Sequence, residues 1–486
     1  MTTAPEGNRN TPPEPGSFLR DTVRNALGSI LLFGGRFIAI AIIARSLGVE
    51  AFGVVVLAIL AADLLVMLML AGLPGVIARF LPVISADDWP RFAALRRNWL
   101  LLSSGGLMLT GPLLAHFVLD LHGILIALFV FWVVISAVQA VSLAEIQGTL
   151  QFDLVVWACG LGALAFVAGA GFVTLFPSLT TVFLVMAAVP LAQLIPWFIL
   201  ARRNTTPSRD SEMPPRRDVF LYGVNVCFIG ALTAVVWSRG ELFVVEEQLG
   251  ELALGHYGAA VTLTAMVWRL TGLLQGAVTP HISRRLKSEE GAGPFLADVS
   301  RLTMTIAAIA ALGIALFGAE LVLLVFGNAY VPTASILAVM APGIAMAGTL
   351  TVTLGVQLMS NARVPRNALA FGAVALLGGA YLLAGWYEAE GAATARMLTM
   401  CGVSAAMPLW LIWQGSGALG RQILLELIGT VLLVSIGSAL ALFGGLDLAS
   451  RAVIWLVTSY AILVRATGGY TPQAMVRRTL GILRAL

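Results

Sequence analysis

Residues 25–82 read NALGSILLFGGRFIAIAIIARSLG (25–48), VEAFG (49–53) and VVVLAILAADLLVMLMLAGLPGVIARFLP (54–82). One short turn joins two apolar runs, and each run is long enough to cross a bilayer, which takes about 20 apolar residues. The first run carries Arg36 near its middle, and the second carries Asp63 at a similar depth. A charge at the centre of a membrane helix costs about 2.5–3.5 kcal/mol on insertion scales. We therefore expect these two residues to face a cavity, a partner or a pathway.

The composition predicts an integral membrane protein. Of the 486 residues, 59% are apolar and only 11% are charged, whereas about 25% of the residues in a soluble domain are charged. The apolar runs have the length of membrane helices, and they lack the roughly 10-residue alternating pattern of barrel strands. The predicted fold class is an all-α integral membrane protein. No cluster of His and Cys suggests a metal, and no residue is nominated as catalytic.

Apolar runs bounded by charge, Gly or Pro predict 14 transmembrane helices. They span residues 25–46, 54–78, 99–118, 124–147, 154–175, 179–201, 219–240, 255–280, 302–319, 333–359, 367–387, 391–413, 423–443 and 449–466. The predicted organisation is a polar tail (1–24), an N-lobe of six helices (25–201), a linker (202–218), a C-lobe of six helices (219–413), two further helices (414–466) and a basic amphipathic tail (467–486).

The basic residues predict the orientation of these helices. If the N-terminus is cytoplasmic, 23 of the 29 Lys and Arg residues fall in segments on the cytoplasmic side. An excess of Lys and Arg marks cytoplasmic loops. We therefore expect both termini and the linker 202–218 to be cytoplasmic.

A short repeat indicates that the two lobes are related by pseudo-symmetry. The turn with Leu47, Gly48 and Gly53 recurs with Leu249, Gly250 and Gly255, 202 residues later, between the predicted helices 7 and 8. Repeated lobes with a site at their interface are a common plan for transporters. We expect the two turns to approach each other and to separate during transport.

Three stretches resemble Wzx-type polysaccharide flippases of the MOP (multidrug/oligosaccharidyl-lipid/polysaccharide) exporter superfamily. The first is ARSLGVEAFG (44–53), the second is QLGELALGHYGAAVTL (248–263) with TPHIS (279–283), and the third is VFGNAY (325–330). They occur in the order and at the topological positions of that family, and the resemblance covers nearly the whole chain.

The resemblance implies 12 or 14 helices in two lobes around a V-shaped cavity, and transport by alternating access. It implies a transporter, not an enzyme, that moves polyprenyl-diphosphate-linked oligosaccharides across the bacterial inner membrane for surface or exopolysaccharide synthesis. The implied partners are the lipid-linked glycan, membrane lipids and polysaccharide polymerase machinery, with no cofactor and no nucleic acid.

Such a flippase must hold a diphosphate inside the membrane, and arginine suits this task because its planar fork binds phosphate oxygens through two hydrogen bonds. Arg36 and Arg269 are near the middles of the predicted helices 1 and 8. Arg239 and Arg396 are near the outer ends of helices 7 and 12. These four arginines are the predicted substrate-binding residues.

Two acidic residues are predicted to serve in coupling or in ion pairs. Glu241 follows Arg239 at the outer end of helix 7, and Asp63 is expected to be the only well-buried carboxylate. An ion pair between Arg36 and Asp63 with a purely structural role is an open alternative. A cation-coupled multidrug exporter of the same superfamily is the alternative function. Such exporters depend on carboxylates, whereas two arginines at mid-depth favour an anionic substrate.

Overall fold

The computed structural model describes residues 15–81, 88–149, 151–202, 215–285, 293–359 and 363–466, and every regular element within these ranges is a helix. Residues 1–14 of the predicted tail 1–24, most of the linker and the tail 467–486 lie outside the described residues, whereas residues 15–24 already belong to a helix. The N-lobe contains α1 (Pro15–Leu47), α2 (Val49–Leu70), α3 (Leu73–Phe80), α4 (Trp89–Phe117), α5 (Ile124–Gly148), α6 (Phe152–Leu175) and α7 (Leu179–Arg202).

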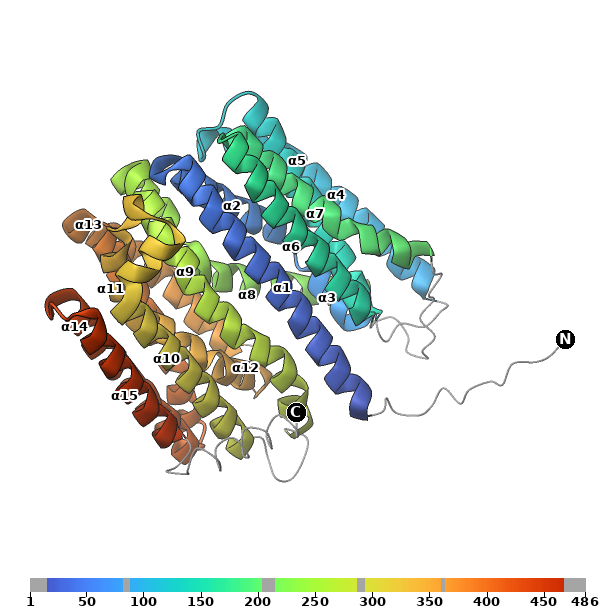
Figure 1. Cartoon of the computed structure of the whole chain (residues 1–486). Helices are drawn as coiled ribbons and strands as arrows, with labels where there is room; N and C mark the ends of the chain where they lie inside the picture. The colour runs from blue at the N-terminus through green and yellow to red at the C-terminus, as the bar shows by residue number, and fades with distance from the viewer. Residues whose placement is uncertain are drawn as a thin grey trace.

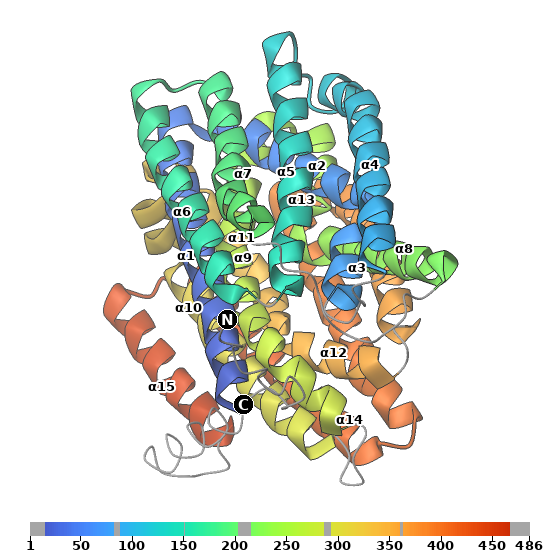
Figure 2. The same cartoon turned by 90° about the vertical axis from the view of Figure 1, so that its right-hand side faces the viewer.

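The C-lobe and the last two helices complete the bundle. The C-lobe contains α8 (Arg216–Thr233), the π-helix η1 (Ala234–Arg239), α9 (Leu242–Arg285), α10 (Gly293–Val325), η2 (Asn328–Tyr330), α11 (Thr333–Ala345), η3 (Met346–Thr349), α12 (Leu350–Met359) and α13 (Arg363–Trp413). The helices α14 (Gly417–Phe443) and α15 (Leu448–Ala466) follow. Figure 1 shows α1 and α9 side by side between the α4–α7 group and the α10–α15 group, and α15 lies at the edge of the bundle in Figures 1 and 2.

The helices confirm a bundle of about 14 membrane spans. Within the described residues, ten helical segments are long and apolar enough to cross a membrane. Two of these, 217–269 and 363–413, contain 53 and 51 residues, and a break divides each into two spans. The shorter apolar segments 333–349 and 448–464 supply the remaining two.

Several predicted helix boundaries are wrong, and the backbone gives the reason. The predicted helix 54–78 is divided after Leu70, because Ala71 and Gly72 both adopt the left-handed conformation, and α3 then begins with Pro74 in its first turn. The predicted loop 241–254 is instead mostly helical, and only Gly250, with φ 78° and ψ −178°, interrupts α9. Helix 333–359 is broken by the 3₁₀ turn η3.

The two repeated turns share one backbone conformation. Gly48 has φ 83° and ψ 176°, nearly the same angles as Gly250. Only glycine adopts this region readily. The repeat in the sequence therefore corresponds to a repeat in the chain path, in which each turn begins a long helix, α2 in one lobe and the main part of α9 in the other.

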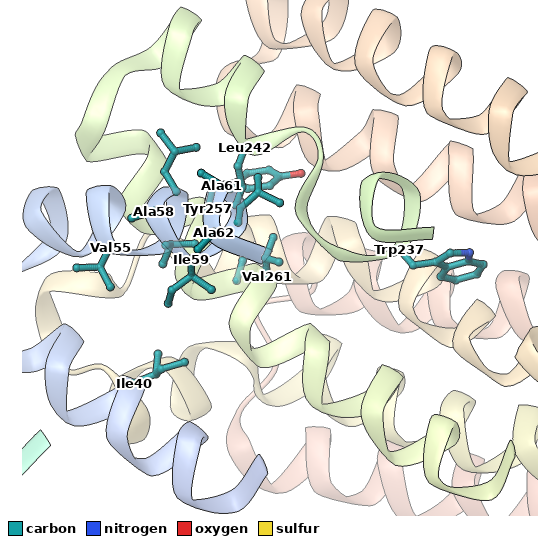
Figure 3. Packing of buried hydrophobic residues seen from close by; sticks show 14 of the residues in the cluster. Ile40, Val55, Ala58, Ile59, Ala61, Ala62, Trp237, Leu242, Tyr257 and Val261 are labelled. Carbon is teal, nitrogen blue, oxygen red and sulfur yellow. The ribbon is translucent and has the colours of Figure 1, made fainter. Parts of the chain in front are cut away.

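These turns meet where the two lobes touch, at the end of the bundle that the basic residues predict to be outer. A Cβ on Gly53 would come within 2.7 Å of Glu251 O, and a Cβ on Gly255 would overlap Val49 O. The contact is reciprocal, because Val49 follows Gly48 as Glu251 follows Gly250. Below it, Val55, Ala58 and Ile59 of α2 pack near Tyr257 and Val261 of α9 (Figure 3). The lobes are thus closed against each other at this end.

A second contact near this interface, which we call the latch, joins the lobes through Arg45 and Tyr330. Arg45, at the end of α1, donates hydrogen bonds to the last carbonyls of α10, including Val325 O at 2.9 Å and Leu324 O. The Tyr330 hydroxyl donates to Ala44 O at 3.0 Å, and the Tyr330 ring packs against Phe52 at 5.9 Å between centroids. A cation at the C-terminal end of a helix is electrostatically favourable.

Candidate functional site

A cavity of about 520 Å³ lies inside the N-lobe. Its walls come from α1, α2, α3, α5, α6 and α7, and α8 of the C-lobe covers one side. In Figure 2, α8 crosses the bundle beside α3. The polar side chains in the wall are Arg36, Asp63, Ser136, Gln139 and Gln193.

Arg36 and Asp63 both line this cavity, as their mid-helix positions predict. The expectation that Asp63 is well buried is wrong, because its side chain is exposed to the cavity. Among the described ion pairs, none within 4.0 Å joins Arg36 to Asp63. A carboxylate that reaches water inside the bundle avoids the desolvation penalty of a sealed charge.

Arg269 extends from α9 toward the same cavity and is exposed. Its guanidinium carbon lies 4.5 Å from the ring centre of Phe33, and Phe33 is part of the cavity wall. A guanidinium over an aromatic face is held by the ring quadrupole. The structure therefore places an arginine of the C-lobe at the rim of the N-lobe cavity, next to Arg36.

Arg239 ends the π-helix η1 and is buried, with 8% of its surface exposed. Its Nη1 atom has no hydrogen-bond partner among the described residues. The charges of Arg36, Asp63, Arg269 and Arg396 all act on it. Short π-helical segments are frequent at functional sites. Arg36, Arg239 and Arg269, from both lobes, thus lie close enough to Asp63 for their charges to interact, and Arg36 shares the cavity wall with it, so the site has excess positive charge.

The other two predicted residues, Glu241 and Arg396, pair with each other inside the C-lobe and do not line the cavity. Glu241 is fully buried and Arg396 is 3% exposed, and Arg396 donates to the Glu241 carboxylate and, at 2.9 Å, to Trp237 O. The Tyr257 hydroxyl donates to Glu241 at 3.1 Å. Glu241 lies between the end of η1 and the start of α9 at Leu242.

Three uncharged polar residues of the cavity are missing from the predicted set. Ser136 and Gln139 are three residues apart on α5 and therefore share a face, and Gln193 lies on α7. The spacing of polar residues within an apolar helix would have found the first two. The sequence pattern of α7 carries no comparable signal for Gln193.

The fold matches solved transporters at low sequence identity. The first, titled "Lipid II flippase MurJ, inward closed conformation", has a TM-score of 0.59 and 12% identity, over 90% of this chain and 98% of that chain. An inward-facing multidrug resistance MATE family transporter of the MOP superfamily has a TM-score of 0.62 and 14% identity, over 84% and 99%. A MATE in the bent conformation has a TM-score of 0.57 and 16% identity, over 86% and 96%.

The sequence comparisons give the family. No curated protein sequence matches the chain. The family model described as "Polysaccharide biosynthesis protein" matches residues 18–285, which is more than half of the chain and extends from the first turn of α1 to the end of α9. The match confirms the family that the sequence motifs indicated, and the fold is that of the MOP transporters. The chain belongs to the polysaccharide biosynthesis protein family.

Proposed function

We propose that this protein flips polyprenyl-diphosphate-linked oligosaccharide units across the bacterial inner membrane by alternating access. The observation that supports this function best is the excess positive charge around the cavity, where Arg36 lines the wall with the carboxylate Asp63 and the charges of Arg239 and Arg269 also act on this site. A diphosphate carries enough negative charge to balance such a cluster. The fold and the family are those of transporters.

We call Arg36, Arg239 and Arg269 the arginine clamp, and the two lobes contribute different residues to it. Arg36 comes from the N-lobe, whereas Arg239 and Arg269 come from the C-lobe. A diphosphate held by both would draw the lobes together around it. A charge-assisted hydrogen bond is roughly twice as strong as a neutral one, and a guanidinium can donate two in parallel. Substrate binding and lobe movement are thereby linked.

Alternating access also needs one end of the bundle to be closed while the other is open. The lobes touch at the end with Gly53 and Gly255. We propose that this end is the outer face, with both termini in the cytoplasm, and that it opens when the loaded cavity turns outward. Membrane lipids and the polysaccharide polymerase machinery are the proposed partners.

The clamp is tested by glycan export in cells that depend on this protein. Arg36→Ala and Arg269→Ala should each lower export about tenfold or more, since a hydrogen bond to a charged group contributes about 1.5–3 kcal/mol. The Lys variants should keep part of the activity, because lysine preserves the charge but lacks the fork. Arg363→Ala, at an exposed position at the start of α13, is the matched control. Normal export by the double Ala variant would contradict the clamp.

A cation-coupled multidrug exporter is the second candidate, and the cavity-exposed carboxylate of Asp63 favours it. In that case Asp63 carries a proton or a cation, and the arginines serve only to balance it. Asp63→Asn should then abolish transport while both Ala variants of the arginines remain active. In the flippase, Asp63→Asn should have a milder effect than the loss of Arg36 or Arg269.

A further inference from the structure

We infer that the N-lobe cavity is the binding site for the saccharide nearest to the diphosphate, with Gln193, Gln139 and Ser136 as its hydrogen-bonding residues. This inference rests on the proposed function and assigns the neutral part of the same substrate. It concerns the part of the cavity that the arginine clamp does not occupy.

The amide of Gln193 is a buried donor that lacks a partner. The side chain is 7% exposed and lines the cavity, and its Nε2 atom has no hydrogen-bond partner among the described residues. An unpaired polar group of this kind costs about 1–3 kcal/mol. Because this nitrogen is itself buried, the amide must turn about its last side-chain bond, a soft torsion, before a sugar hydroxyl in the cavity can accept a hydrogen bond from it.

The neighbouring helix leaves room for this amide. A Cβ at Gly162 of α6 would lie 2.5 Å from Gln193 Nε2 and 2.8 Å from its Cδ. Any other residue at position 162 would displace the amide. Gly160, on the same helix, has no atom within 4 Å of its Cβ position, so α6 tolerates a side chain there.

Acceptors and further donors lie around the same space. Pro190 also lines the cavity, and proline has no N–H, so the carbonyl of Met186 loses its usual helical donor. Ser136 and Gln139 line the cavity from α5, which packs against α7. Amides and hydroxyls both donate and accept hydrogen bonds. The cavity can therefore pair with the mixed donors and acceptors of a sugar ring.

The apolar surface and the size of the cavity agree with a sugar. Trp132 and Phe166 form part of its wall, next to the polar groups. Small-molecule sites are mostly apolar with a few placed polar groups, and they enclose about 300–1,000 Å³. The volume of about 520 Å³ suits the first sugar of a chain better than a whole oligosaccharide.

The positions of Arg36 and Arg269 determine how the diphosphate and its sugar are oriented in the cavity. Arg36 lines the cavity, and Arg269 lies at its rim over Phe33. A diphosphate between them would place its attached sugar against α5 and α7. An organic cation fits less well, because Arg36 would repel it from the only cavity carboxylate, Asp63, among the described residues.

The test compares two kinds of probe on the full-length protein in nanodiscs. One is farnesyl diphosphate, and the others are farnesyl diphosphates that carry glucose, galactose or N-acetylglucosamine. Wild-type protein should bind at least one sugar-linked probe more tightly than the bare diphosphate. Gln193→Met should lower the affinity for that probe about three- to tenfold, the range of one hydrogen bond, and leave the affinity for the bare diphosphate unchanged.

A second variant and a matched control distinguish a specific loss of sugar binding from a general loss of folding. Gly162→Ala should cause the same selective loss, and Gly160→Ala should cause none. Unchanged binding of the bare diphosphate shows that each variant is folded. Arg269→Ala should weaken the binding of every probe.

The outcomes separate this inference from the proposed function. Equal loss for both kinds of probe, no loss with Gln193→Met, or no preference of the wild type for any sugar would overturn the saccharide site while the clamp stands. Full binding of the bare diphosphate by Arg269→Ala would overturn the clamp.

Discussion

The two lobes begin with the same glycine turn but treat charge inside the membrane in opposite ways. The N-lobe encloses about 520 Å³, and the carboxylate in the wall of this cavity, Asp63, is exposed to that space. Beside Trp237 and Arg396 the C-lobe leaves only about 10 Å³. Two larger cavities, of about 370 and 530 Å³, lie between α10 and the last two helices, away from this ion pair. Its carboxylate, Glu241, is fully buried and paired with Arg396.

The difference shows how one repeat can serve two tasks. A carboxylate that contacts water needs no partner, whereas a sealed carboxylate must be paired or lose its charge. Around its ion pair the C-lobe is therefore tightly packed, and it places Arg269 at the rim of the N-lobe cavity. The N-lobe is the hollow body that can receive a ligand. The asymmetry predicts different responses to the same substitution in the two lobes.

The largest effect is expected from the loss of the C-lobe carboxylate. Glu241→Gln leaves Arg396 as a buried charge without its counter-ion, and the loss of one member of a buried pair costs about 3–5 kcal/mol. Asp63→Asn, the equivalent change in the N-lobe, should alter stability by less than about 1 kcal/mol. Thermal unfolding in detergent measures both.

A double variant sharpens this first prediction. In Glu241→Met with Arg396→Met neither member of the buried pair remains, and such replacements are often neutral or stabilising. The double variant should therefore unfold at a higher temperature than Glu241→Gln. Equal destabilisation by Asp63→Asn and Glu241→Gln would show that the lobes do not differ in this way.

At the reciprocal contact between the two glycine turns, a smaller loss of transport is expected, and it should be equal in both lobes. Gly53→Ala and Gly255→Ala each place a methyl group against a backbone carbonyl of the opposite lobe, so each should hinder closure of this end. We expect both to lower transport about tenfold, which corresponds to about 1.4 kcal/mol. Gly160→Ala is the control. A loss in only one of the two variants would show that the contact is not functionally reciprocal.

The smallest effect is expected at the latch. Arg45→Ala removes hydrogen bonds to the end of α10, and we expect the closed state to lose about 1 kcal/mol, so its opening should increase about fivefold. A cysteine at Phe52, which is fully buried in the closed interface, reports opening through its labelling by an impermeant maleimide. Arg45→Lys should fall between the wild type and Arg45→Ala. Unchanged labelling in both variants would exclude a latch.

The success of the fold prediction and the failure at helix boundaries have one cause. Hydropathy is a property of each segment alone, so the apolar runs predict their number and order. The break after Leu70 depends on the left-handed backbone at Ala71 and Gly72, and the helix at 242–249 depends on its packing in the C-lobe. Both features depend on contacts with neighbouring helices, and the sequence of one segment carries no information about those contacts.

The candidate site was likewise predictable from the sequence only in part. By itself the sequence determined that Arg36, Asp63 and Arg269 would be functional or paired, because a charge in a long apolar run has few alternatives. Only the tertiary structure decided that Asp63 faces an open cavity, that Glu241 is sealed against Arg396, and that Gln193 is the unpaired donor in the wall. The reason is that burial and pairing are relations between helices distant in the chain. The cost of a charge can be read from one helix, but its partner cannot.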